Sequence, residues 1–408
     1  MKRKLYSKIA AHLNSNEHSI ITGSRQTGKT TILEQLYEEL LQKKETVFIL
    51  TFEDPDVLRE VNLHPENLLK FVDEKPAKGS GRKIFILIDE IQYAENPSNL
   101  LKYVYDKYKG KVKVIATGSS AFYIDRNFKD SLAGRKRIFE LYTLDFEEFL
   151  IFKNQNEIRE QWLNTLSDPH YIAPEKRSIE ILFDEYLIYG GYPAVVLEPD
   201  VEEKMLLLSE LVTTYLKRDV TESNIRDFLR FQNLVKVLAS NTGGLVNSNE
   251  LGKTLKISRP AQENYFYVLQ KCFHLHFLKP FFRNLSKELV KMPKVYFNDL
   301  GFRNALLNYY EPVENRIDKG ALVENYAFIR LRDLYGTDNL HFWRTADGKE
   351  IDFVVNESYT KGKAIEIKFN GSEFNEKAYK VFRDSYPDYT LDCIAYKNNN
   401  EVSSLLKF

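Results

Sequence analysis

The chain has 408 residues, which is long for a single hydrophobic core, and a prior of about 150 residues per domain predicts two to four domains. Its 58 basic and 58 acidic residues leave no net charge, so a contact with nucleic acid would have to come from a local basic patch. The two cysteines, Cys272 and Cys393, form no C-x-x-C pair, which argues against a zinc site or a disulfide framework. Polar residues follow the basic segment 1–8 where a secretory signal needs an apolar run, and no run approaches the roughly 20 apolar residues of a membrane span. We therefore expect a soluble, cytoplasmic protein.

The most informative stretch is Gly23–Thr30, which satisfies the pattern G-x-x-x-x-G-K-[ST] of a phosphate-binding loop, or P-loop. A short β-rich run, 18–22, precedes it, and 31–41 follows with apolar residues at helical spacing. In this setting backbone N–H groups converge on the phosphates, Lys29 reaches the β- and γ-phosphates, and the Thr30 hydroxyl holds Mg²⁺. The alternative, a glycine-bearing turn into a helix, is much weaker given the full match. The predicted ATP-contacting residues are Gly23, Ser24, Arg25, Gln26, Thr27, Gly28, Lys29, Thr30 and Thr31.

Three further apolar runs, 46–52, 83–88 and 112–116, predict strands of a parallel sheet that is buried on both faces. The second run ends in Asp89 and Glu90, the acid pair expected of a Walker B strand. We predict that Asp89 holds Mg²⁺, directly or through water, and that Glu90 orients or deprotonates the attacking water. An isolated strand that ends in two acids usually only marks where the strand meets solvent, but its position after a P-loop favours catalysis.

Hydroxyl residues and one arginine complete the predicted nucleotide site. Thr117, Ser119 and Ser120 end the strand at 112–116, where a hydroxyl can bond the water or the γ-phosphate. Each of them can equally cap the following turn. Arg135 is a candidate sensor of the γ-phosphate, in cis or from a neighbouring subunit of a homo-oligomer, and the alternative is a solvated arginine.

From about residue 144 the sequence becomes rich in helical patterns, at 146–152, 179–189 and 202–217, which we interpret as a helical lid. Segments 225–239, 249–255 and 259–272, followed by possible strands at 274–281 and 294–298, resemble a winged helix-turn-helix. In that interpretation Lys253, Lys256 and Arg259 contact DNA phosphates. The third helix also carries many apolar residues, so a packing or protein-binding role stays open.

The last hundred residues contain a second possible chemical site. Glu324 lies in a helical pattern, Asp352 in the strand-like run 350–355, and Glu366 and Lys368 in the strand-like run 364–368. Since strand side chains alternate, Glu366 and Lys368 share a face, and a hairpin would bring Asp352 beside them. Two carboxylates and a lysine can bind Mg²⁺ and activate water for phosphodiester cleavage, as in PD-(D/E)XK nucleases. Charged residues that alternate on a strand face are also ordinary, so cleavage is left open.

Together these features resemble a prokaryotic family in which an AAA-type ATPase core is joined to a C-terminal domain of unknown function 4143. The resemblance rests on the following motifs: Gly23–Thr30, Leu87–Gln92, Ala116–Ser120, Leu132–Arg135, Phe146–Leu150, Tyr189–Pro193, Lys294–Phe297, Asp299–Gly301, Gly320–Asn325, Glu350–Phe353 and Glu366–Lys368. It implies ATP binding with Mg²⁺, a helical and winged-helix middle, and a restriction-endonuclease-like C-terminal fold. Ile351, rather than proline, precedes the strand aspartate, which leaves metal-dependent cleavage open.

We therefore predict an α/β fold with four domains: a P-loop ATPase core at 1–148, a helical lid at 149–224, a winged-helix domain at 225–310 and a nuclease-like α/β domain at 311–408. The expected function is an Mg²⁺-dependent ATPase coupled to a region that binds, and in one version cleaves, DNA. The alternative is a nucleotide-dependent switch or scaffold that binds a protein partner and carries a silent nuclease fold.

Overall fold

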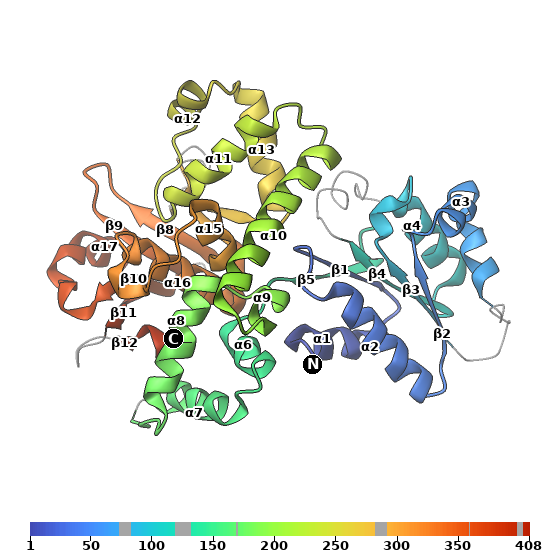
Figure 1. Cartoon of the computed structure of the whole chain (residues 1–408), viewed down its shortest axis with the longest axis horizontal. Coiled ribbons are helices and arrows are strands. Elements are labelled where there is room, and N and C mark those ends of the chain that lie inside the picture. The colour runs from blue at the N-terminus through green and yellow to red at the C-terminus, as the bar shows by residue number, and fades with distance from the viewer. Residues whose placement is uncertain (73–82, 119–131, 169, 282–291, 359, 398–402) are drawn as a thin grey trace. The chain divides into compact units, whose positions relative to one another are not determined.

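The computed structural model describes residues 1–72, 83–118, 132–168, 170–281, 292–358, 360–397 and 403–408 (Figure 1). The described residues form two compact units. The first unit comprises residues 1–142 and 271–273, and the second unit comprises residues 143–270 and 274–408. In the part of the chain that the structure describes, no helix combines the length and the apolar character needed to cross a membrane.

The first unit is a five-stranded parallel sheet with strand order β2-β3-β4-β1-β5. Its strands are β1 His18–Gly23, β2 Thr46–Thr51, β3 Ile84–Asp89, β4 Val112–Gly118 and β5 Lys136–Leu141. Its α-helices are α1 Lys4–Ala11, α2 Lys29–Gln42, α3 Pro55–Leu63 and α4 Pro97–Tyr108. The predicted α/β class with a parallel sheet is therefore confirmed, with β5 as an edge strand that we did not predict.

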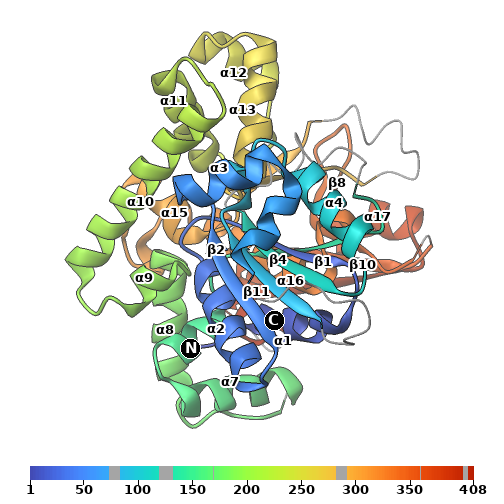
Figure 2. The ribbon, with the colours of Figure 1, turned by 90° about the vertical axis from the view of Figure 1, so that its right-hand side faces the viewer.

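Helices cover both faces of this sheet because strand side chains alternate between two apolar cores. Ile21 and Leu87 pack with α1 and α2 on one face, whereas Ile20 and Ile86 pack with α3 and α4 on the other (Figures 1 and 2). The parallel arrangement places the carboxyl ends of β1, β3 and β4 at one edge of the sheet. Ligands of open α/β sheets bind at such an edge.

The second unit combines helices with a five-stranded mixed sheet of order β12-β11-β10-β9-β8 and a two-stranded sheet, β6-β7. Its α-helices are α6 Phe146–Phe152, α7 Asn156–Ser167, α8 Lys176–Tyr189, α9 Pro193–Leu197, α10 Val201–Glu222, α11 Phe228–Ser240, α12 Ser248–Leu255, α13 Arg259–Lys271, α15 Leu300–Leu307, α16 Lys319–Tyr335 and α17 Lys380–Ser385. Its strands are β6 Leu275–Leu278, β7 Lys294–Phe297, β8 Leu340–Arg344, β9 Glu350–Asn356, β10 Gly362–Asn370, β11 Tyr389–Lys397 and β12 Ser403–Ser404.

One hydrophobic core runs through most of the second unit and includes Phe146 on α6, Phe183 on α8, Tyr296 on β7, Tyr326 on α16 and Ile367 on β10. Phe146 lies just before the three domains that we predicted after residue 148, and the other four residues lie within those domains. The lid segment, strand β7 and the C-terminal sheet therefore share one apolar core. The chain passes from the first unit to the second between residues 142 and 143, just before α6, and residues 271–273 belong to the first unit again.

Helices α11, α12 and α13 lie side by side in both views and are followed by the antiparallel pair β6-β7, in the order that we predicted (Figures 1 and 2). The strand pair differs from an exposed wing. All four residues of β7 are buried, and the Tyr296 ring stacks on Phe328 of α16 at a centroid distance of 4.8 Å. The strand β7 thus serves as a packing element of the core.

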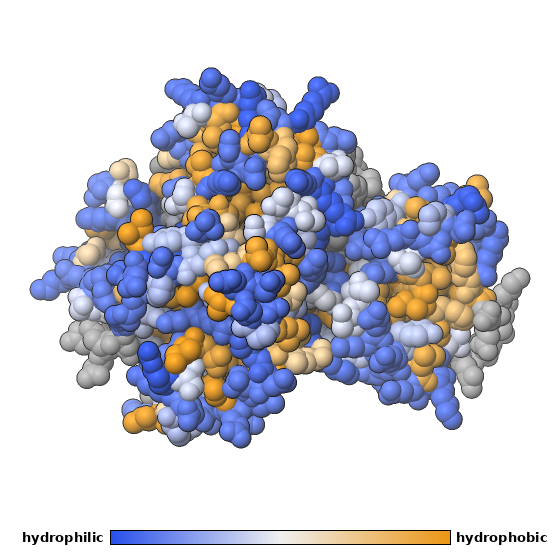
Figure 3. Space-filling view, viewed as in Figure 1, coloured by the Kyte–Doolittle hydropathy of each residue, from blue (hydrophilic) through white to orange (hydrophobic). Residues whose placement is uncertain are grey.

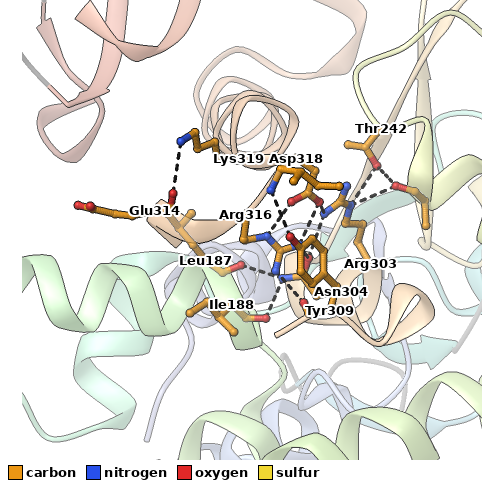
Figure 4. Close-up of polar contacts among 12 residues, drawn as sticks. Leu187, Ile188, Thr242, Arg303, Asn304, Tyr309, Glu314, Arg316, Asp318 and Lys319 are labelled. Atoms are coloured by element: carbon orange, nitrogen blue, oxygen red, sulfur yellow. Dashed lines mark hydrogen bonds and ion pairs between the residues drawn. The ribbon is translucent and has the colours of Figure 1, made fainter. Parts of the chain in front are cut away.

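Two buried arginines of the second unit share one carboxylate and one amide (Figure 4). Arg303 on α15 and Arg316, which precedes α16, both hydrogen-bond to Asn304 Oδ1, at 3.1 and 3.0 Å. Both also form ion pairs with the Asp318 carboxylate. Burial alone would raise the pKa of this carboxyl, but the bonds from Arg316 and the charge of Arg303 hold it below the usual range.

The same network reaches two further helices (Figure 4). Asn304 donates its amide to the carbonyl oxygens of Leu187, at 3.1 Å, and Ile188, at 2.8 Å, both on α8. Arg303 donates from Nε to the Ala239 carbonyl oxygen on α11 at 3.2 Å. The cluster therefore joins α8, α11, α15 and the start of α16, which come from three of the predicted domains.

Candidate functional sites

The predicted P-loop joins β1 to α2 at the carboxyl edge of the parallel sheet. A Cβ atom on Gly23 would lie 2.0 Å from the Leu141 carbonyl oxygen, so the close approach of β5 requires glycine there. Gly28 has φ 94°, in the left-handed region that glycine tolerates, and it caps the N-terminus of α2. The first N–H groups of α2 have no helical partners and therefore form an anion-binding position.

Lys29 is buried inside the loop, with 6% of its surface exposed. Its Nζ donates to the carbonyl oxygens of Gly23, at 3.0 Å, and Ser24, at 2.7 Å. Burial lowers the pKa of Lys29 to about 8, and the negative charge of Glu90 opposes this effect. A phosphate beside this ammonium would compensate its lost hydration, because an anion favours the charged form of a lysine.

Arg3 braces the loop from outside the predicted motif. Its guanidinium donates to the Thr27 carbonyl oxygen at 2.6 Å and to the Tyr142 carbonyl oxygen at 2.9 Å. The Thr27 hydroxyl closes the loop on itself through a 2.8 Å bond to the Ser24 carbonyl oxygen. We did not predict a role for Arg3, since a basic residue near the N-terminus, well before the motif, carries no local signal.

Thr30 of the P-loop lies beside two residues that were predicted at strand ends, Asp89 and Thr117. The Thr30 hydroxyl donates to Asp89 Oδ2 at 2.9 Å, and the Thr117 hydroxyl donates to Asp89 Oδ1. Asp89 comes from the end of β3 and Thr117 from the end of β4, which are neighbouring strands. Carboxylate and hydroxyl oxygens are the ligands that Mg²⁺ prefers, so these residues fit the predicted metal.

Glu90 lies directly after β3 with φ 55°, a left-handed conformation that is unusual for this residue type. Its backbone N–H donates to the Thr117 hydroxyl at 3.1 Å, and its carboxylate accepts a hydrogen bond from Gln92. A strained backbone held by specific bonds is a feature of functional positions. Gln92, which we did not include among the site residues, orients the Glu90 carboxylate.

Arg135 does not join this group. It precedes β5, and its carbonyl oxygen accepts from the His18 N–H at 2.8 Å, at the amino end of β1. Gly23, at the other end of β1, is roughly 17 Å away at strand spacing. The Arg135 guanidinium pairs with Asp106 at 2.7 Å. This position argues against our interpretation that Arg135 senses the γ-phosphate in its own subunit, whereas sensing in a neighbouring subunit stays a prediction. Ser119 and Ser120 lie outside the described residues.

In the second unit the four residues of the predicted nuclease-like site converge. Strands β9 and β10 form the expected antiparallel hairpin. Asp352 Oδ2 accepts from the Ile367 N–H at 2.9 Å, and Lys368 Nζ contacts Glu366 Oε1 at 2.6 Å. Glu324 lies beside Asp352, since both carboxylates contact the Lys294 ammonium, at 2.9 and 3.3 Å. Burial, followed by the negative charge of Asp352, raises the pKa of Glu324.

A fifth residue, Lys294 on β7, lies among these acids and was absent from our predicted site. Its Nζ is 2.9 Å from Glu324 Oε1, 2.6 Å from Glu350 Oε1 and 3.3 Å from Asp352 Oδ1. The hydroxyl of Tyr296, two residues later on the same strand face, donates to Glu324 Oε1 at 2.5 Å. Burial disfavours the ammonium, but the surrounding carboxylates hold the pKa of Lys294 well above its ordinary value.

Three family models match successive parts of the chain. An AAA domain matches residues 15–150, and two domains of unknown function, DUF8612 and DUF4143, match residues 180–312 and 319–404. The chain is an AAA-domain protein with a C-terminal DUF4143 domain. With the P-loop described above, this makes it an ATP-binding protein of the ATPase type.

Sequence relatives extend over most of the chain. An uncharacterized protein of Methanocaldococcus jannaschii is 26% identical over 95% of this chain and 83% of its own length. An uncharacterized protein of Haemophilus influenzae is 27% identical over 82% of this chain and 78% of its own length. Among solved structures, the Aeropyrum pernix ORC1 protein in complex with DNA covers 74% of this chain and 91% of its own, with a TM-score of 0.32 and 11% identity. A likeness this weak has no bearing on function.

Proposed function

We propose that the first unit hydrolyses ATP with Mg²⁺ and that the nucleotide state controls a DNA-contacting surface on the second unit. The observation that carries the first part is the contact of Thr30 and Thr117 with the Asp89 carboxylate, next to the buried Lys29. The P-loop and the ends of β3 and β4 thereby place an ammonium, two hydroxyl groups and a carboxylate beside the anion-binding N-terminus of α2. P-loop ATPases use this set of groups.

In the proposed reaction the N–H groups of the loop and the Lys29 ammonium hold the phosphates. Thr30 and Asp89 would bind Mg²⁺, which neutralises negative charge on the β- and γ-phosphate oxygens. The Glu90 carboxylate accepts a proton from the attacking water as the water oxygen bonds to the γ-phosphorus. The bond from that phosphorus to the bridging oxygen breaks, and ADP leaves with its electron pair.

Replacing Glu90 with glutamine tests this assignment. The amide keeps the size of the side chain but cannot accept the proton, so we expect ATP binding to stay within about two-fold and turnover to fall by about 10²-fold or more. Steady-state ATP hydrolysis and equilibrium binding of a fluorescent ATP analogue measure the two quantities. The exposed Glu34→Gln on α2 is the control, and undiminished turnover in Glu90→Gln would remove Glu90 from the mechanism.

The DNA part of the proposal rests on basic residues where α12 turns into α13. Lys253, Lys256 and Arg259 are exposed, and hydrophilic side chains cover α12 in Figure 3. The apolar residues of α13, such as Tyr265 and Leu269, favoured a packing or protein-binding role for this helix in the sequence analysis. In the structure both side chains are buried within the second unit. They therefore leave the outer surface of α12 and the start of α13 to polar and charged side chains.

Removing these three charges should weaken DNA binding in a salt-dependent way. For Lys253→Ala/Lys256→Ala/Arg259→Ala we expect the slope of log affinity against log salt to become smaller by about 3, because each phosphate contact contributes about 1. Fluorescence anisotropy of labelled duplex DNA at several salt concentrations measures the slope. The exposed Lys236→Ala on α11 serves as control, and an unchanged slope in the triple variant would locate DNA binding elsewhere.

A further inference from the structure

The nuclease-like cluster of the second unit carries more negative than positive charge. Four carboxylates converge there, those of Glu324, Glu350, Asp352 and Glu366. Among the described residues, three positively charged side chains contact these carboxylates. Lys294 contacts Glu324, Lys368 contacts Glu366, and Arg344 contacts Glu350. Gathering buried carboxylates costs free energy unless cations neutralise them. In a metal-dependent nuclease a divalent ion neutralises them, whereas here the side-chain charges of the described residues in the cluster come within one unit of balance.

Donors from the chain engage most of the carboxylate oxygens of this cluster. Asp352 Oδ1 faces Lys294, and Oδ2 accepts from the Ile367 N–H. Glu324 Oε1 receives both Lys294 and the Tyr296 hydroxyl. Within the described ranges, no three Asp, Glu, His or Cys side chains are arranged to hold a metal ion.

The backbone holds Lys294 in this position. It begins β7, pairs with Leu278 in the two-stranded sheet and forms a further bridge to Leu245. Only 2% of its side chain is exposed, and its Nζ lies 5.7 Å from the centre of the Phe342 ring. Swinging the ammonium out would leave Asp352 and the partly buried Glu324 and Glu350 without their shared cation, which is unfavourable.

We propose that Lys294 is a built-in cation that occupies the metal position of the nuclease-like site, so that this site binds no catalytic Mg²⁺ or Mn²⁺ and does not cleave DNA. The proposal goes beyond ATP hydrolysis and does not depend on it, because every residue involved belongs to the second unit. The acids and Lys294 instead bond β7 to α16 and β9. The nuclease-like fold is thereby kept as a structural element.

The test is to replace Lys294 with an uncharged residue and to measure whether a divalent metal ion then binds at the cluster. In full-length protein without nucleotide, Lys294→Met should bind one more Mn²⁺ per chain than wild type. Electron paramagnetic resonance of free Mn²⁺ counts the sites. Adding Asp352→Asn to Lys294→Met should abolish the extra site, and the exposed Lys279→Met should behave as wild type.

Two results would overturn the proposal. One is a folded Lys294→Met protein, verified by circular dichroism, that binds no more Mn²⁺ than wild type. The other is Mn²⁺ binding or plasmid cleavage by the wild-type protein that is lost in Asp352→Asn. This second result needs no lysine variant, so it remains decisive if Lys294→Met does not fold. Wild-type protein whose Mn²⁺ count is unchanged by Asp352→Asn, and which leaves plasmid intact with Mg²⁺ or Mn²⁺, supports it.

Discussion

Replacing Lys29 with methionine is expected to weaken ATP binding by about 100-fold or more and to reduce hydrolysis to background. The ammonium now donates to two loop carbonyls and would donate to the β- and γ-phosphates when ATP binds. Two charge-assisted bonds of about 1.5 kcal/mol each correspond to a factor of roughly 100 in affinity. Hydrolysis falls further because the same charge stabilises the transition state.

Methionine is the informative replacement because the Lys29 stem is buried and a smaller side chain would also leave a cavity. Equilibrium binding of a fluorescent ATP analogue and phosphate release measure the effect. Lys102→Met, at an exposed position on α4, controls for loss of a positive charge. Unchanged hydrolysis in Lys29→Met would contradict the assignment of the P-loop as the hydrolytic site.

Replacing Asp318 with alanine is expected to destabilise the second unit by about 3–5 kcal/mol. This carboxylate is the shared partner of Arg303 and Arg316, whose side chains are at most 1% exposed. Without it, two buried guanidinium groups face each other with their charge uncompensated, and breaking such a pair has effects of this size. Because the network joins α8, α11, α15 and α16, we expect the whole unit to unfold as one body.

The chain offers a specific probe for this measurement, since both of its tryptophans, Trp162 and Trp343, lie in the second unit. Urea unfolding followed by tryptophan fluorescence therefore reports on that unit alone. Glu314→Ala is the control, because its carboxylate pairs with Lys397 at the surface and should matter by less than about 1 kcal/mol. Equal midpoints for both variants would mean that the buried arginines are satisfied in another way.

The placement of the P-loop and of the residues at the strand ends could be predicted because its signals are local. Gly23–Thr30 is contiguous, and the conformations of Gly23 and Gly28 follow from a strand that turns into a helix. Asp89 and Thr117 are distant in sequence, but parallel strands direct their carboxyl ends to one edge, so an apolar run followed by an acid was informative. The strand at 136–141 escaped prediction because it is an edge strand with charged residues and no continuous apolar run.

The cluster around Asp352 shows where local patterns stop being informative. Side-chain alternation along β10 and the pairing of β9 with β10 bring Glu366, Lys368 and Asp352 together, and both features follow from the sequence pattern. Lys294, in contrast, is distant in sequence from each acid that it contacts and begins a strand that we interpret from sequence as part of a DNA-binding wing. Its role depends on how β7 packs against α16, which no local pattern reports.

By itself the sequence determined that this chain carries a P-loop ATPase core with Asp89 and Glu90 at a strand end, because those residues act through the backbone of their own segment and a regular parallel sheet. Only the tertiary structure decided that Arg135 lies at the far edge of that sheet, that α8, α11, α15 and α16 share one ion network, and that Lys294 lies among the C-terminal acids. The physical reason is that these outcomes depend on long-range packing. There the need to neutralise buried charge, rather than any local propensity, selects the partners.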